Sequence, residues 1–116
     1  MPKQIAILAF KGETMCFVHA LLNALDMHEK GFDVKVILEG AATGQISQMP
    51  EAEDHFAQLY RKVKEKGLVD VVCQACAKQM NSLEAARAQS LPLSAEMSGH
   101  PPLAPYVEAG YQIITF

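Results

Sequence analysis

Apolar residues recur along this chain in two kinds of segment, and the two kinds alternate. The first kind is a short, nearly unbroken apolar run, often rich in β-branched residues, with no helical period. Such runs are typical of strands that are covered on both faces, as in parallel sheets. The fourth of these runs has the weakest pattern. Strands are expected at residues 4–10, 32–38, 68–73, 91–97 and 111–116.

The second kind of segment predicts helices. Within residues 51–66, apolar side chains recur at i, i+3, i+4 and i+7, which places them on one face of a helix. Residues 15–30 are apolar around most of the helix, so more than one sheet face should cover them, and an oligomer partner is one way to supply that cover. Helices are expected at residues 15–30, 51–66, 74–80, 83–89 and 103–109.

Strand and helix follow each other through the whole chain, without a linker, an internal repeat or a low-complexity tract. This alternation favours an α/β fold with a mostly parallel sheet that carries helices on both faces. The length of 116 residues suits one domain. We therefore expect a single α/β domain over residues 1–116, built around a sheet of about five strands.

Composition narrows the class of function. Half of the residues are apolar, which argues against disorder, and a net charge of -3 without a basic block argues against nucleic-acid binding. The first apolar run is too short to span a membrane and lacks a cleavage-site pattern, so we expect a cytoplasmic protein that does not enter membranes. In that reducing compartment the three cysteines are expected to be thiols rather than structural disulfides.

Cysteine and histidine occur in segments that should meet at one edge of the sheet, because ligand sites of open α/β sheets form beyond the carboxyl ends of the strands. Cys73 ends a predicted strand where a helix begins. The positive end of that helix favours the thiolate, which is the reactive form of the side chain. Cys76 lies within the first turn of the same helix, so the two sulfurs can form a Cys-x-x-Cys pair. Cys73 is the leading catalytic candidate, with Cys76 as its partner.

His100 follows Gly99 and precedes two prolines, in a loop that should hold the imidazole near Cys73 as a base or a ligand. Together with Cys76 these residues provide three metal ligands, fewer than a structural zinc site uses, so we predict no metal and no other cofactor. Cys16 is expected to pack in the core or in an interface. Signatures of phosphate-binding loops, dinucleotide-binding glycines and serine hydrolases are absent from the sequence.

Several short features occur in a fixed order and spacing: the first strand with its loop, the helix end and second strand at residues 21–38, the run 71–73 before an alanine-rich helix start, the segment 91–99, and the closing helix, glycine and strand at residues 107–116. With these features the chain resembles the DsrE/DsrF/TusD-like family of small sulfur-handling proteins over nearly its whole length. The resemblance implies a three-layer α/β/α sandwich around a five-stranded parallel sheet, and an assembly as a homo- or hetero-oligomer.

The resemblance also implies a role for Cys73. In the sulfurtransferase members, a cysteine after the third strand carries sulfur as a persulfide and passes it to a partner thiol. That position falls on Cys73 here, and it implies a sulfur donor protein and an acceptor protein as partners. Relatives often carry a small residue at the position of Cys76, so this chain departs from the simplest pattern, and Cys76 is a candidate to attack a persulfide on Cys73.

Two other interpretations of the sequence stay open. The chain is a non-catalytic, oligomeric subunit that binds a ligand or partner, with structural cysteines, if its thiols are buried and unreactive. Alternatively, the Cys-x-x-Cys pair is a redox or metal site. Members of one fold often differ in activity, so the fold alone does not choose among these functions.

Overall fold

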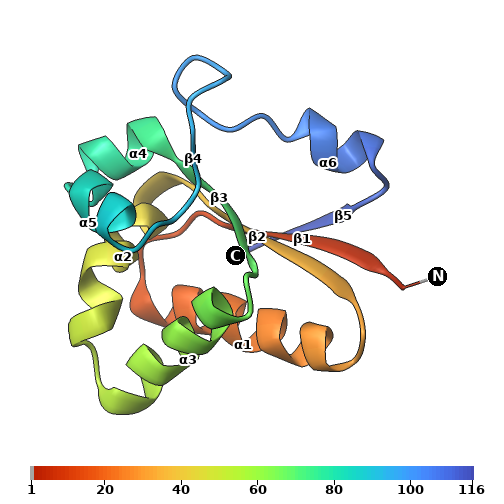
Figure 1. Cartoon of the computed structure of the whole chain (residues 1–116), viewed down its shortest axis with the longest axis horizontal. Helices are drawn as coiled ribbons and strands as arrows, with labels where there is room; N and C mark the ends of the chain where they lie inside the picture. Colours follow the sequence, from red (N-terminus) through yellow and green to blue (C-terminus); the bar gives the residue numbers. More distant parts are fainter. Residues whose placement is uncertain (1) are drawn as a thin grey trace.

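The computed structural model describes residues 2–116 and shows a five-stranded sheet with helices on both faces (Figure 1). All strand pairs in the sheet are parallel, and the strand order is β4-β3-β2-β1-β5. The predicted α/β class, the parallel sheet and the three-layer arrangement are therefore confirmed. The strands are β1 (Gln4–Ala9), β2 (Asp33–Leu38), β3 (Val69–Cys73), β4 (Leu93–Ser94) and β5 (Gln112–Thr115).

Helices and short 3-10 turns make the connections between the strands. Two features differ from the sequence prediction. Residues 40–44, for which the sequence predicted neither a strand nor a helix, fold into a 3-10 turn that buries Ala42 and Thr43. The predicted helix 51–66 starts only at Asp54, because the chain is extended at Ala52. The helical elements are α1 (Thr14–Glu29), η1 (Gly40–Gly44), α2 (Gln45–Gln48), η2 (Met49–Glu51), α3 (Asp54–Glu65), α4 (Gln74–Gln79), α5 (Leu83–Ala88) and α6 (Ala104–Glu108).

The larger part of the core lies between one face of the sheet and the helices α1, α3, α4 and α5. Phe17 of α1 and Tyr60 of α3 are almost fully buried there, and their rings pack with centroids 6.1 Å apart. Side chains that alternate along β1 and β2 form the sheet side of this core: Ile5, Ile7, Ala9, Val34, Val36 and Leu38. Burial of this apolar set is the main force that holds the helices on the sheet.

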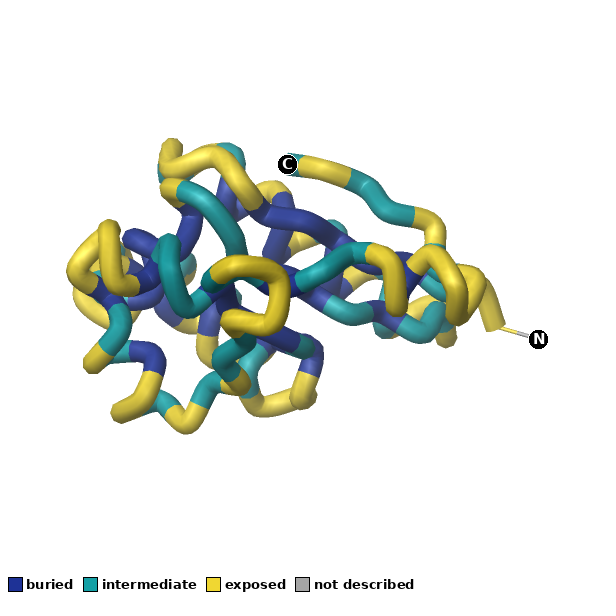
Figure 2. The backbone as a smooth tube through the Cα atoms, turned by 90° about the horizontal axis from the view of Figure 1, so that it is seen from above, coloured by how far each residue is buried: buried dark blue, intermediate teal, exposed yellow. Residues whose placement is uncertain are grey.

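The opposite face of the sheet carries a thinner layer. Tyr106 of α6 packs there against Ala6, Leu8, Ile37 and Val71 of the three central strands. Figure 2 shows the buried backbone concentrated in the middle of the molecule, with the exposed backbone in the outer connections. The short α6 therefore covers only part of this face, and Figure 1 shows it lying apart from the helices of the other layer.

Candidate functional site

The carboxyl ends of β1, β2 and β3 meet at one edge of the sheet, as the parallel order requires. The backbone N–H of Ala42 donates to the carbonyl of Phe10, which joins the loops after β1 and β2. The N–H of Ala75, in the first turn of α4, donates to the carbonyl of Gly99 at 3.0 Å. The segment before α6 is thereby fixed to the start of α4, directly beyond Cys73.

Cys73, Cys76 and His100 come together at this edge. The sulfur of Cys73 lies 2.9 Å from His100 Nδ1, and the sulfur of Cys76 lies 3.6 Å from the same nitrogen. The backbone N–H of Cys76 donates to the sulfur of Cys73 at 3.4 Å. All three donor atoms lie within 4.8 Å of one another. The structure therefore places the three residues selected from the sequence in one cluster.

The Cys73 thiol is fully buried, with 0% of the residue exposed. The pKa of this thiol is raised to about 12, mainly by burial and also by a hydrogen bond with the Cys76 thiol, while the Cys76 N–H acts to lower it. The expectation that the helix N-terminus favours the thiolate of Cys73 is therefore wrong, because the loss of water on burial outweighs the effect of the helix N-terminus. Cys73 is a buried thiol beside an imidazole that can accept its proton.

Cys76 is the more accessible sulfur of the pair, since it is only partly buried and lines an apolar hollow of about 330 Å³. Phe10 and Met80 stand on the rim of this hollow with 50% and 40% of their surfaces exposed. The remaining lining residues are Gly40, Ala41 and Gln79. Gly40 has a φ of +59°, and a Cβ added to it would lie 2.8 Å from the Phe10 ring, so only glycine fits there. A reagent or partner thiol thus reaches Cys76 first.

Glu39 is a charged residue of this edge that the sequence interpretation did not single out. It follows β2 directly, and burial raises the pKa of its carboxyl, while the nearby His100 lowers that pKa. Its charge also raises the pKa of Cys73. The signal available in the sequence was its position at the carboxyl end of a strand, next to a run of small residues that lets other loops approach.

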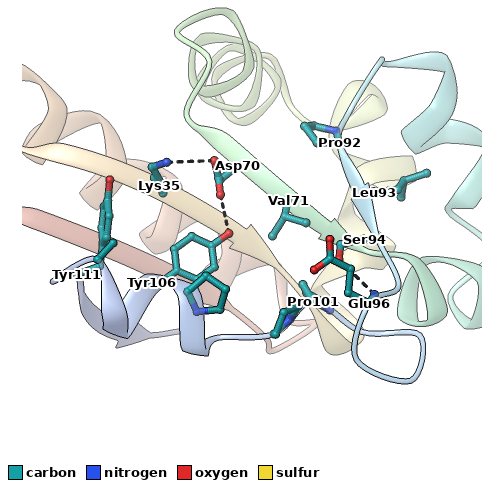
Figure 3. A pocket seen from close by; sticks show the side chains of 13 residues that line it. Lys35, Asp70, Val71, Pro92, Leu93, Ser94, Glu96, Pro101, Tyr106 and Tyr111 are labelled. Carbon is teal, nitrogen blue, oxygen red and sulfur yellow. Dashed lines mark hydrogen bonds and ion pairs between the residues drawn. The ribbon is translucent and has the colours of Figure 1, made fainter.

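A second and larger hollow lies on the opposite face of the sheet, between α6 and strands β2 to β4 (Figure 3). It has a volume of about 400 Å³. Asp70 on its floor accepts a hydrogen bond from Tyr106 and lies 3.6 Å from the ammonium of Lys35 (Figure 3). Neither Cys73 nor Cys76 lines this larger hollow. The smaller hollow, which Cys76 lines, is the one next to the thiols.

Cys16 does not join the cluster of Cys73, Cys76 and His100 among residues 2–116. It is partly buried in the first turn of α1. None of the helices described by the structure has both the length and the apolar character that a crossing of the lipid bilayer requires.

The fold and the site define a small parallel α/β domain with a buried thiol, a second accessible thiol and an imidazole at the carboxyl edge of its sheet. Comparison with protein families gives a match to the DsrE/DsrF-like family over residues 7–116. The chain therefore belongs to the DsrE/DsrF-like family, and its fold is of the sulfur-relay type.

Two curated proteins and one solved structure are similar to this chain. An uncharacterized protein of Methanocaldococcus jannaschii is 36% identical over 97 residues, which cover 84% of this chain and 77% of that protein. An uncharacterized protein of Archaeoglobus fulgidus is 42% identical over 43 residues, which cover 37% of this chain and 70% of that protein. A solved structure of a conserved protein of unknown function from Bacteroides thetaiotaomicron has a TM-score of 0.72 at 16% identity, with 98% of this chain and 95% of that chain covered. The last comparison concerns the fold alone.

Proposed function

We propose that this protein is a sulfur carrier that holds one sulfane sulfur atom as a persulfide on Cys73 and passes it to a partner thiol. The observation that carries the proposal is the convergence of two sulfurs on one imidazole nitrogen, at 2.9 Å and 3.6 Å. Membership of the DsrE/DsrF-like family supports it. The partners are a donor protein that bears a persulfide and an acceptor protein that bears a thiol, and the reducing cytoplasm is the compartment that suits this chemistry.

The entry of sulfur follows from the difference in exposure between the two cysteines. The Cys76 sulfur attacks the outer sulfur of the donor persulfide, so the donor leaves as a thiolate that takes up the proton from Cys76. The Cys73 thiol then gives its proton to His100 Nδ1 and attacks the outer sulfur on Cys76. The Cys73 persulfide forms, the bond between Cys76 and that outer sulfur breaks, and the proton on His100 returns to Cys76. No net oxidation or reduction occurs in either step.

The two residues beside the sulfurs assist these exchanges. His100 holds the proton of Cys73 during the second step and returns it to Cys76, since its Nδ1 is near both sulfurs. The Cys76 N–H points at the Cys73 sulfur and stabilises negative charge while the proton is away. The return step reverses the order, and the acceptor thiolate removes the outer sulfur from Cys76.

The experiment is mass spectrometry of the reduced protein after incubation with a persulfide donor, with peptide mapping of the added sulfur atom. Wild type should gain the mass of one sulfur on the peptide that contains Cys73. Cys76→Ser should load Cys73 at least about tenfold more slowly, because the accessible thiol is gone. Cys16→Ser is the control and should load like wild type. The same tryptic peptide contains Cys76, so fragmentation of this peptide is used to locate the sulfur. If the sulfur in wild type stays on Cys76, Cys73 is not the sulfur carrier.

A further inference from the structure

We propose that Cys73, Cys76 and His100 also form a binding site for one Zn²⁺ ion, with the two thiolates and the imidazole Nδ1 as ligands. The site is independent of sulfur transfer, because it requires only that both thiols are free. A Zn²⁺ ion and a persulfide compete for the same two sulfurs, so metal binding would switch sulfur loading off.

The distances in the cluster are close to those of a zinc site. Bond lengths of about 2.3 Å to sulfur and about 2.0 Å to nitrogen in a tetrahedron put a sulfur and a nitrogen ligand about 3.6 Å apart. The Cys76 sulfur already lies 3.6 Å from His100 Nδ1. The Cys73 sulfur lies 2.9 Å from that nitrogen, within hydrogen-bond distance and about 0.7 Å closer than two ligands of one zinc ion. A sub-ångström outward movement of one side chain makes room for the ion.

The protein backbone holds these ligands in place before an ion arrives. Cys73 is the last residue of β3, and the next turn of α4 presents Cys76 and directs its N–H at the Cys73 sulfur. The His100 loop is fixed by the bond from Ala75 N–H to the Gly99 carbonyl and by hydrogen bonds in both directions between the backbones of Met97 and His100. Ligands on rigid elements lose little freedom when the metal binds.

Charge also suits a divalent cation. Two thiolates neutralise Zn²⁺, so the complex can occupy a largely buried position without a net charge. The Glu39 carboxylate, whose charge acts on both His100 and Cys73, adds a negative potential on the same side. Lysine and arginine are absent from the residues that line the hollow beside Cys76. The fourth position of the ion faces this hollow and remains open for water or an exchangeable ligand.

The test is an optical titration of the reduced, metal-free full chain with Co²⁺, which reports sulfur ligands through charge-transfer absorption, followed by displacement with Zn²⁺. One equivalent should bind per chain with a thiolate-to-cobalt band. Cys73→Ser should remove this band, and Cys76→Ser and His100→Ala should each weaken binding at least about tenfold. Cys16→Ser and His19→Ala, which change a cysteine and a histidine outside the cluster, should bind like wild type.

Thermal unfolding distinguishes a variant that has lost a metal ligand from a variant that does not fold. Each variant is first melted without metal, and a variant that folds should lose the rise in Tm that Zn²⁺ gives wild type. Absence of the charge-transfer band in wild type, or an unchanged band in a folded Cys76→Ser variant, overturns the zinc site. Because sulfur loading is measured separately with a chelator present, a protein that carries sulfur but binds no Co²⁺ overturns this inference alone.

Discussion

Two effects of opposite sign act on the Cys73 sulfur. The N–H groups at the start of α4 favour the thiolate, and the surrounding protein, which excludes water, favours the thiol. Cys76 lies one helical turn further on, at the wall of an open hollow, and so keeps contact with solvent. The two cysteines of the motif therefore differ in accessibility: Cys76 is partly exposed, and Cys73 is buried.

Alkylation rates should reveal this difference. In native, metal-free Cys16→Ser protein at neutral pH, Cys76 should react with iodoacetamide at least about tenfold faster than Cys73, because the alkylating reagent needs an accessible thiolate. Peptide mapping after timed quenching measures both rates. In denaturant the two rates should become similar. Equal rates in the native protein would contradict the burial of Cys73.

Gly99 should matter for the position of His100. Its φ is +98°, and a Cβ there would lie 3.0 Å from the Cβ of Ala75. Gly99→Ala should therefore lower the free energy of unfolding by about 1–2 kcal/mol and slow sulfur loading, because the loop that carries His100 shifts. Gly31→Ala is a matched control, since its φ is +87° with no atom within 4 Å of the added Cβ. It should lose similar stability in urea unfolding but load sulfur normally.

At the scale of elements, the sequence predicted the strands and helices whose apolar patterns are clear. The strands β1, β2 and β3 and the helix α1 follow from their apolar runs and lie within a few residues of the predicted bounds. β4 consists of Leu93–Ser94 alone, which pair with Val72 and Cys73, so it is shorter than the predicted strand at residues 91–97. The burial of Glu39 could not be predicted, because residues from loops far apart in sequence create it. The burial of Cys73 also depends on long-range packing, so the sequence alone did not predict that its thiol is the favoured form.

The helix α6 is held partly by one buried hydrogen bond. Tyr106 Oη donates to Asp70 at 2.5 Å, and burial together with this bond raises the pKa of Tyr106 above its ordinary value. The unfolded phenol ionises at a pH of about 10, so the folded state holds the proton more tightly. This contribution to stability is complete below about pH 10 and is lost as the pH rises toward the folded pKa.

Tyr106→Phe should therefore lower the free energy of unfolding by about 1–3 kcal/mol at neutral pH, since it leaves Asp70 without this donor. It should also lose less stability than wild type as the pH rises above about 10. Urea unfolding across this range measures both effects. Tyr111→Phe, which removes a bond to Asp33 at a more exposed position, should cost less at neutral pH. A wild-type pH slope in Tyr106→Phe would contradict the assignment.

For the whole molecule, the exposed apolar side chains bear on assembly. Met15 and Leu22 lie seven residues apart on α1 and have 57% and 44% of their surfaces exposed. Spacing of i, i+7 places them on one side of the helix. We expect a second copy of the chain to cover them, as the sequence pattern of this helix predicts.

Sedimentation equilibrium should then give a mass above that of one 12.7 kDa chain. Leu22→Glu should shift the equilibrium toward the monomer at least about tenfold, because a charge would be buried in the contact. Val107→Glu, at a position that is 62% exposed on the opposite face, is the control and should assemble like wild type. A monomeric wild type would rule out this contact.

The connection from β4 to β5 passes from one border of the sheet to the other, and it carries His100 on the way. Cys73 and Cys76 come from consecutive elements and gain their places as soon as β3 and α4 form, whereas the imidazole arrives from a position 27 residues after Cys73. The hydrogen bond from the Ala75 N–H to the Gly99 carbonyl anchors the loop that carries it. The site is therefore complete only once this later loop has docked on α4, and until then a newly made chain would display two thiols without their imidazole.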